Sequence, residues 1–358
     1  MSLHPLIELS NDSDVKKAKG FKEKAAELTG ERLEEMYQQE VGQAPDRASA
    51  GKKYLGVRTS RTPSGPQAGK DDRHFALALD AWAKAGDRSI ELPGGEALSL
   101  VDCTVPLRTA APDRALGDQD PNKGVEDIDV LGLLPDDRVA VVRTKFLAAS
   151  ATRGGAGDTP LRALLSGLAQ AAMVDARRAA IGEAIENQTG RKISDEAPAL
   201  ILAGSPRYWE ICRKREAQKG AAWIRELERL GREIATSIGV EVFFLGLSVG
   251  ADPAWRYEET GPVLEADPDC NPAWESGAGK LKPKPKARAR KLDPANVIVE
   301  ADPSRPSRPY RISDTFESGD TLVHPKLGTG VVQGVVGRGK IAVLFGEEKK
   351  LLVHERGQ

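Results

Sequence analysis

Two apolar stretches joined by a tight turn constrain the fold of this chain more than any other feature. Residues 127–134 and 138–146 are rich in Val, Leu and other apolar residues, and each has the length of a β-strand. The residues between them, Pro135-Asp136-Asp137, are typical of a turn. Strands connected by so short a turn pair as antiparallel neighbours, so the sequence predicts a β-hairpin inside a buried sheet.

Helices and further strands are expected on both sides of this hairpin. A short helix at residues 74–84 and strands at 88–92 and 97–102 precede it, and strands at 199–203 and 240–247 follow it. Thr159 and Pro160 favour the start of a helix. That helix has the apolar face Leu161, Leu164, Leu165, Leu168 and Ala172, and a second amphipathic helix carries Trp223, Leu227, Leu230, Ile234 and Ile238. This mixture predicts an α/β fold in which a partly parallel, mixed sheet is flanked by helices.

Changes in composition divide the chain into five expected segments. Residues 1–40 are expected to form a helical arm, residues 41–70 a linker and residues 71–250 the α/β domain. Residues 251–309 are expected to be a Pro-rich and basic linker, followed by a small β-barrel at residues 310–358. Its short strands are predicted at residues 321–324, 330–336, 340–345 and 349–354. Strands this short can bury a core only by curling into a barrel.

Cysteine, histidine and charge content narrow the possible classes of protein. The three cysteines, Cys103, Cys212 and Cys270, include no C-x-x-C pair, and the four histidines lack metal-ligand spacing. This pattern favours a reducing compartment, and we expect a cytoplasmic protein. No stretch reaches the roughly 20 apolar residues that span a membrane and no signal peptide is expected, so we predict no membrane partner. The net charge of −1 means that affinity for nucleic acid must come from local basic patches.

The hairpin resembles the core of the PD-(D/E)XK nuclease superfamily, in which an aspartate opens one strand and an acid-x-lysine triplet ends the next. Asp129 matches the aspartate and Lys145 matches the lysine, and the later elements up to residue 250 follow the order of that fold. The resemblance implies a restriction-endonuclease-like core that acts on DNA. It also implies that two carboxylates hold Mg²⁺, that the metal generates hydroxide and that the lysine orients the water.

Arg143 stands where this family has its second acid. A cation there repels Mg²⁺ and removes an oxygen ligand, so we expect Mg²⁺ to bind weakly or not at all. Asp129, Arg143 and Lys145 are expected to share one catalytic-type site, with Asp129 and Asp127 as the metal ligands. Substitute acids would be Glu126, Asp102 and Asp158, although each also has a plain structural interpretation. The polar stripe of the next helix is expected to face the same site with Arg162, Ser166 and Gln170.

The last fifty residues resemble a second family. Gly319-Asp320, His324-Pro325 and Gly328-Thr329-Gly330 have the spacing that opens the tudor-like barrels of CarD-type RNA-polymerase-interacting proteins and of some repair-helicase tails. The resemblance implies that the barrel docks to a protein partner. A cage for methylated lysine needs several clustered rings, and only Phe316, Phe345 and Tyr310 are near, so we expect no such cage.

A basic run in the second linker predicts contacts with DNA phosphates. Its residues are Lys280, Lys282, Lys284, Lys286, Arg288, Arg290 and Lys291. The sequence thus predicts a DNA-associated protein with a nuclease-type fold, weak or inactive as a metal-dependent nuclease, with a barrel that binds protein. Two alternatives stay open. One is an active Mg²⁺-dependent DNA endonuclease in DNA repair or phage defence, and the other is a non-enzymatic scaffold or transcription-associated protein that binds only protein.

Overall fold

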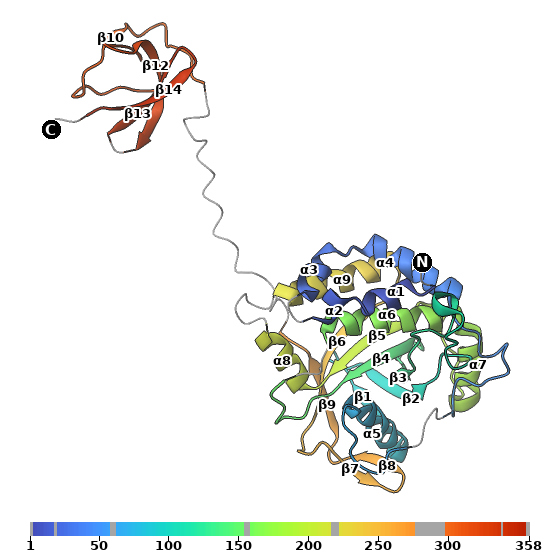
Figure 1. The fold of residues 1–358 in the computed structure, drawn as a ribbon. Helices are drawn as coiled ribbons and strands as arrows, with labels where there is room; N and C mark the ends of the chain where they lie inside the picture. Colours follow the sequence, from blue (N-terminus) through green and yellow to red (C-terminus); the bar gives the residue numbers. More distant parts are fainter. Residues whose placement is uncertain are drawn as a thin grey trace. The chain divides into compact units, whose positions relative to one another are not determined.

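The computed structural model describes residues 3–17, 20–57, 62–153, 158–215, 222–275, 298–337 and 339–355 (Figure 1). The chain divides into two compact units, Met1–Leu281 and Lys282–Gln358. The first contains a mixed sheet flanked by helices, and the second contains a separate sheet. None of the described helices is both long enough and apolar enough to cross a membrane.

A seven-stranded sheet forms the centre of the first unit, in the order β1-β2-β3-β4-β5-β6-β9. The strands are β1 (Ser89–Glu91), β2 (Ala97–Val105), β3 (Ile128–Leu133), β4 (Val139–Lys145), β5 (Ala199–Gly204), β6 (Val242–Val249) and β9 (Pro268–Pro272). The β3–β4 hairpin is antiparallel, whereas β4, β5 and β6 run parallel to one another. The mixed, partly parallel sheet that the sequence predicts is therefore confirmed. Its parallel strands end together at one edge.

Helices cover both faces of this sheet (Figure 1). One face packs against α6 (Pro160–Ala176), and its predicted apolar face, Leu161, Leu164, Leu165, Leu168 and Ala172, is fully buried. The other face packs against α5 (Asp71–Gly86) and a small two-stranded sheet of β7 (Trp255–Glu258) and β8 (Gly261–Leu264). Further helices of this unit are α7 (Arg178–Thr189), α8 (Pro206–Arg215), α9 (Ala222–Ser237) and the 3₁₀ turn η1 (Gly117–Gln119).

The N-terminal residues, expected as a helical arm, pack against the main body and belong to its core. Their helices are α1 (Pro5–Ser10), α2 (Ser13–Lys16), α3 (Phe21–Glu27) and α4 (Gly30–Gln43). They pack over α6 and α9, and the rings of Phe21 and Trp223 meet edge to face at 5.8 Å. Tyr54 and Leu55, within the expected linker, are buried in this cluster too. Likewise β9 extends the sheet beyond residue 250, so the boundaries expected at residues 40, 70 and 250 do not separate units.

A buried ion pair anchors the start of α1. His4 Nδ1 lies 2.6 Å from Glu40 Oε2, and both side chains are buried. The other carboxylate oxygen of Glu40 accepts hydrogen bonds from the backbone N–H groups of Leu6 at 2.8 Å and Ile7 at 3.3 Å. Burial acts to lower the pKa of His4, but the hydrogen bond and charge of Glu40 outweigh it, so the pKa is raised. The imidazolium form of His4 therefore holds α1 on α4.

The C-terminal unit contains a five-stranded sheet in the order β10-β11-β12-β13-β14. Its strands are β10 (Arg308–Pro309), β11 (Thr321–His324), β12 (Gly328–Gly337), β13 (Lys340–Phe345) and β14 (Glu348–Val353). The four strands predicted from the sequence are confirmed to within two residues. Phe316, Leu322, Val332, Ile341 and Val343 form its core. Gly330 is required there, because a Cβ atom would lie 2.6 Å from the ring of Phe345.

Replacing His4 is expected to change how stability depends on pH. A raised pKa means that the folded protein binds this proton more tightly than the unfolded chain. The stability that protonated His4 contributes is therefore complete below the unfolded-state pKa of about 6.5. It is lost as pH rises through the folded-state pKa. In urea unfolding measured across this range, His4→Gln should lose that dependence. It should also lower the free energy of unfolding by about 3 kcal/mol, because Glu40 stays buried without its cation. His324→Gln, in the other unit, is the control, and equal pH profiles for His4→Gln and the wild type would contradict the assignment.

Folding of the C-terminal unit alone is expected to depend on where the fragment begins. The side chain of Gln333 is buried and pairs with the backbone of Val299 through two hydrogen bonds of 2.7 and 2.9 Å. Arg305 also contacts the buried carboxylate of Asp320 at 2.9 Å. A fragment of residues 298–358 should give dispersed amide NMR signals. One that begins at Ser307 should be about 1–3 kcal/mol less stable, because it leaves the side-chain oxygen of Gln333 without its donor, the N–H of Val299. Equal stability of the two fragments would show that these contacts contribute nothing.

Candidate functional site

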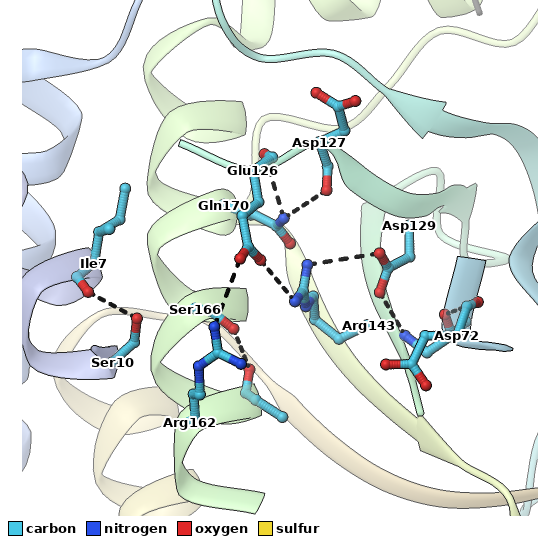
Figure 2. A network of polar contacts seen from close by, with 12 residues as sticks. Ile7, Ser10, Asp72, Glu126, Asp127, Asp129, Arg143, Arg162, Ser166 and Gln170 are labelled. Carbon is cyan, nitrogen blue, oxygen red and sulfur yellow. Dashed lines mark hydrogen bonds and ion pairs between the residues drawn. The ribbon is translucent and has the colours of Figure 1, made fainter. Parts of the chain in front are cut away.

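Arg143 joins two carboxylates at the edge of the β3–β4 hairpin. Its Nη2 lies 3.0 Å from Glu126 Oε2, and its Nη1 lies 3.6 Å from Asp129 Oδ1. Figure 2 shows the guanidinium between them. The Arg143 side chain is only 9% exposed although it is charged. The predicted proximity of Asp129 and Arg143 is thus found, and Glu126, which precedes β3, completes the group.

A glycine in α6 makes room for this arginine. A Cβ atom at Gly167 would lie 3.1 Å from Arg143 Cγ and 2.6 Å from a methyl carbon of Leu200. The helix can therefore approach β4 and β5 closely only because position 167 has no side chain. Close packing of α6 is what buries the stem of Arg143 and leaves its charged end at the hairpin edge.

The polar stripe of α6 faces the same group, as expected from the sequence. Arg162 Nη2 lies 3.7 Å from Glu126 Oε1, the carboxylate oxygen that Arg143 does not contact (Figure 2). Gln170 Nε2 donates a 2.9 Å hydrogen bond to the carbonyl of Asp127. Ser166 is different, because its hydroxyl donates to the carbonyl of Ala163 within the helix. The side-chain oxygen of Gln170 and the Nε atoms of Arg143 and Arg162 are buried without a hydrogen-bond partner in the described part of the chain.

Lys145 binds a different pair of acids. Its Nζ lies 2.6 Å from Asp72 Oδ2 and 3.0 Å from Asp158 Oδ1. Thr144 connects this pair to the first group, since its N–H donates to Asp129 Oδ2 at 2.9 Å and its hydroxyl donates to the carbonyl of Asp72 at 3.0 Å. Asp129 and Lys145 thus belong to one network, although each has its own counter-ions.

Asp72 belongs to this site but is not predicted by the sequence. It lies in the first turn of α5, where acidic residues are common because they favour the positive end of the helix dipole. Besides Lys145, it accepts a 2.7 Å hydrogen bond from the N–H of Phe146. The sequence predicts this helix only from residue 74, and no local signal connects Asp72 to β4.

The pKa shifts show how strongly these charges depend on one another. Burial acts to raise the pKa of Glu126, but Arg143 and Arg162 outweigh it and hold the pKa below its ordinary value. Burial raises the pKa of Asp129, although Arg143 and Lys145 act to lower it. For Arg143, burial acts to lower the pKa, but Asp129 and Glu126 raise it. The guanidinium therefore favours the ionised form of both carboxylates, and it outweighs burial at Glu126 but not at Asp129.

The residues at this site do not fit Mg²⁺. Asp129 is engaged by Arg143 and the Thr144 amide, and the carboxylate of Asp127 lies 3.9 Å from Arg108. Oxygen ligands that are already paired with cations and N–H donors leave no set that could surround a hard divalent ion. We therefore derive no catalytic step through a metal here.

Asp102 is not a substitute ligand, because it lies in another cluster. Among the described residues, one group of metal-type ligands comes close enough together to hold an ion, and it consists of Asp80, Asp102 and Cys103. Lys84 Nζ lies 2.8 Å from Asp80 and 3.4 Å from Asp102, so one ammonium already pairs with both carboxylates and offsets part of their charge. Burial raises the pKa of the Cys103 thiol, which keeps it protonated.

A pocket of about 580 Å³ opens beside Arg143. Its charged lining residues are the cations Lys70, Arg73, Arg108 and Arg143 and the acids Glu126, Asp127 and Asp129. In the part of the chain that the structure describes, neither Lys70 nor Arg73 forms a salt bridge, and the Nε of Arg73 is buried without a hydrogen-bond partner. We call this the basic pocket.

The second group of predicted DNA contacts lies elsewhere in the chain. The seven residues Lys280, Lys282, Lys284, Lys286, Arg288, Arg290 and Lys291 are outside the described residues. Their contact with phosphates stays a prediction.

Comparison with models of protein families, with curated proteins and with solved structures finds no significant match to this chain. The geometry of the site is therefore the basis for a functional proposal.

Proposed function

We propose that the first unit binds DNA through its phosphate backbone and does not cut it by a Mg²⁺-dependent reaction. The observation that carries this proposal is Arg143, buried between Glu126 and Asp129 where a nuclease of the resembled family has an acid. A guanidinium supplies positive charge at a fixed place, but it cannot exchange ligands or lower the pKa of a bound water as a metal does. Such a site can hold a phosphate and lacks the means to hydrolyse it.

The charge of the basic pocket supports a phosphate ligand. Its lining has four cationic and three anionic side chains, which leaves an excess of one positive charge. One phosphodiester group carries one negative charge and several acceptor oxygens. The Nε of Arg73 is buried without a hydrogen-bond partner among the described residues, and planar guanidinium groups match the geometry of phosphate oxygens.

The order of elements supports a nuclease-type fold as part of this proposal. An antiparallel hairpin, β3–β4, is followed by α6 and then by β5, which lies parallel to β4. This order agrees with the resemblance of residues 71–250 to the PD-(D/E)XK superfamily. Asp129 and Lys145 then occupy the positions of the family's aspartate and lysine, with Arg143 as the difference.

For the C-terminal unit we propose a small tudor-like barrel that docks to a protein. The Tyr310 hydroxyl, next to β10, hydrogen-bonds the carbonyl of Val353 in β14, which favours closure of the sheet. Among the described residues, the large apolar side chains that are exposed lie almost all in this unit, namely Ile298, Ile312, Val323, Leu327, Val335, Val336 and Leu351. An unusual share of exposed apolar side chains favours a role in binding another protein.

Arg73→Ala is expected to weaken DNA binding by the full-length protein. The plot of log affinity against log salt should become less steep by about 0.7–0.9, which corresponds to one lost phosphate contact. Arg88→Ala is the matched control, because Arg88 is an arginine near the other end of α5 and already pairs with Asp267. A mobility-shift series with single-stranded and duplex DNA gives the slopes. Failure of the wild type to bind either DNA even at low salt would favour the protein-binding scaffold.

Arg143→Glu is expected to create a metal site that the wild type lacks. It removes the cation and adds an oxygen ligand beside Asp129, so Mg²⁺ or Mn²⁺ should raise the melting temperature of this variant and not that of the wild type. Arg143→Gln, which removes the charge without adding a carboxylate, is the control, and Asp129→Ala in the Arg143→Glu background should abolish the effect. Plasmid cleavage by the wild type with either metal, lost in Asp129→Ala, would overturn the proposal.

A further inference from the structure

A second pocket of about 580 Å³ lies where the three parallel strands end. Phe146 and Leu147 follow β4, Ser205 and Pro206 follow β5, and Leu247 and Val249 close β6. Ligands of open α/β sheets commonly bind in the crevice beyond the carboxyl ends of such strands, because the connecting loops diverge there. We call this the apolar pocket, since most of its lining side chains are apolar.

Aromatic rings form one rigid wall of the apolar pocket. The rings of Phe146 and Trp255 lie 4.4 Å apart between their centres. The Tyr257 hydroxyl is 2.6 Å from His74 Nδ1 and accepts a 3.2 Å hydrogen bond from Trp255 Nε1. Trp255 also stacks on Phe75 of α5. Because each ring is held by another, this wall is already formed before any ligand binds.

The first turn of α5 separates the apolar pocket from the basic pocket. Lys70 and Arg73 line the basic pocket, and Asp71, between them in the chain, lines the apolar one. One helical turn rises about 5.4 Å, so the walls of the two pockets come within a few ångströms of each other at this turn. Asp72 strengthens the boundary, because it binds both Lys145 and the N–H of Phe146. In a DNA strand, a phosphate group and the base of a neighbouring nucleotide are also only ångströms apart.

We infer that the apolar pocket accepts an unpaired nucleobase from a DNA strand whose phosphates occupy the basic pocket. This inference rests on the proposed function and narrows its ligand to single-stranded DNA or DNA with unpaired bases. A base in a duplex is stacked on both sides and cannot enter a concave pocket, whereas an unpaired base presents its flat face to aromatic side chains. A phosphate is a poor occupant of the apolar pocket, because its lining has no excess of positive charge: Arg207 and Arg256 are balanced by Asp252 and the exposed carboxylate of Asp71. That carboxylate suits the amino group of a base.

The test compares three ligands of one length by fluorescence anisotropy: a single-stranded oligonucleotide, the same strand with abasic residues at its centre, and the duplex. The full-length wild type should bind the intact single strand about tenfold more tightly than the abasic strand or the duplex, since stacking of one base on an aromatic ring contributes on this scale. Ala148→Trp places an indole at the mouth of the apolar pocket from an exposed position. It should reduce binding of the intact strand to the level of the abasic strand and leave abasic binding unchanged.

Two further variants test whether the effect of Ala148→Trp comes from filling the apolar pocket. Ala85→Trp makes the same change at an exposed position near the other end of α5 and should bind like the wild type. Phe146→Leu retains an apolar side chain but removes the ring, and it should also lower the preference for intact over abasic strands.

Equal binding of intact and abasic strands by the wild type, or equal effects of Ala148→Trp and Ala85→Trp, would overturn the inference. In that case a weakening of all three ligands by Arg73→Ala would still support the phosphate site. No effect of Arg73→Ala would remove both proposals.

Discussion

The buried guanidinium of Arg143 is the constraint on which the centre of this molecule depends. An arginine this far from water is tolerated only when carboxylates neutralise it, and removing one partner of a buried ion pair typically costs about 3–5 kcal/mol. Its two partners come from different places, Glu126 from the segment before β3 and Asp129 from β3 itself. Arg162 of α6 then shares Glu126. One cation thereby fixes the hairpin edge relative to the helix that covers it.

A second set of charges connects the opposite face of the sheet to the same strand. Lys145, two residues beyond Arg143, binds Asp72 at the start of α5 and Asp158 shortly before α6. The end of β4 is therefore attached to helices on both faces. This explains why both pockets are found here, because the strand end, the helix start and the loops that diverge from the parallel strands meet at one edge.

Local patterns predicted the elements of this fold well, and distant contacts account for what they missed. The hairpin, the apolar face of α6 and the strands of the C-terminal sheet all have regular apolar spacing, which is visible within ten or so residues. Asp72 and Lys145 are 73 positions apart, and nothing in either neighbourhood indicates the other. The glycine and proline content of residues 41–70 predicts a linker. Tyr54 and Leu55 are buried there without any periodicity to reveal it. The edge strand β9 was missed because it begins and ends with proline, which disfavours strands in general but is compatible with an edge.

The packing of α3 and α4 on α9 has a consequence for how the protein is made. The ring of Phe21 meets Trp223, the N–H of Gly30 donates to Glu233, and Arg229 donates to the carbonyl of Ala25. These contacts join the first part of the chain to a helix that is translated about 200 residues later. During synthesis the N-terminal helices therefore leave the ribosome with their apolar sides exposed, and they find their final surface only after α9 has emerged. The N-terminal helices therefore complete their packing late in synthesis, and until then their apolar sides are open to contact with other apolar surfaces.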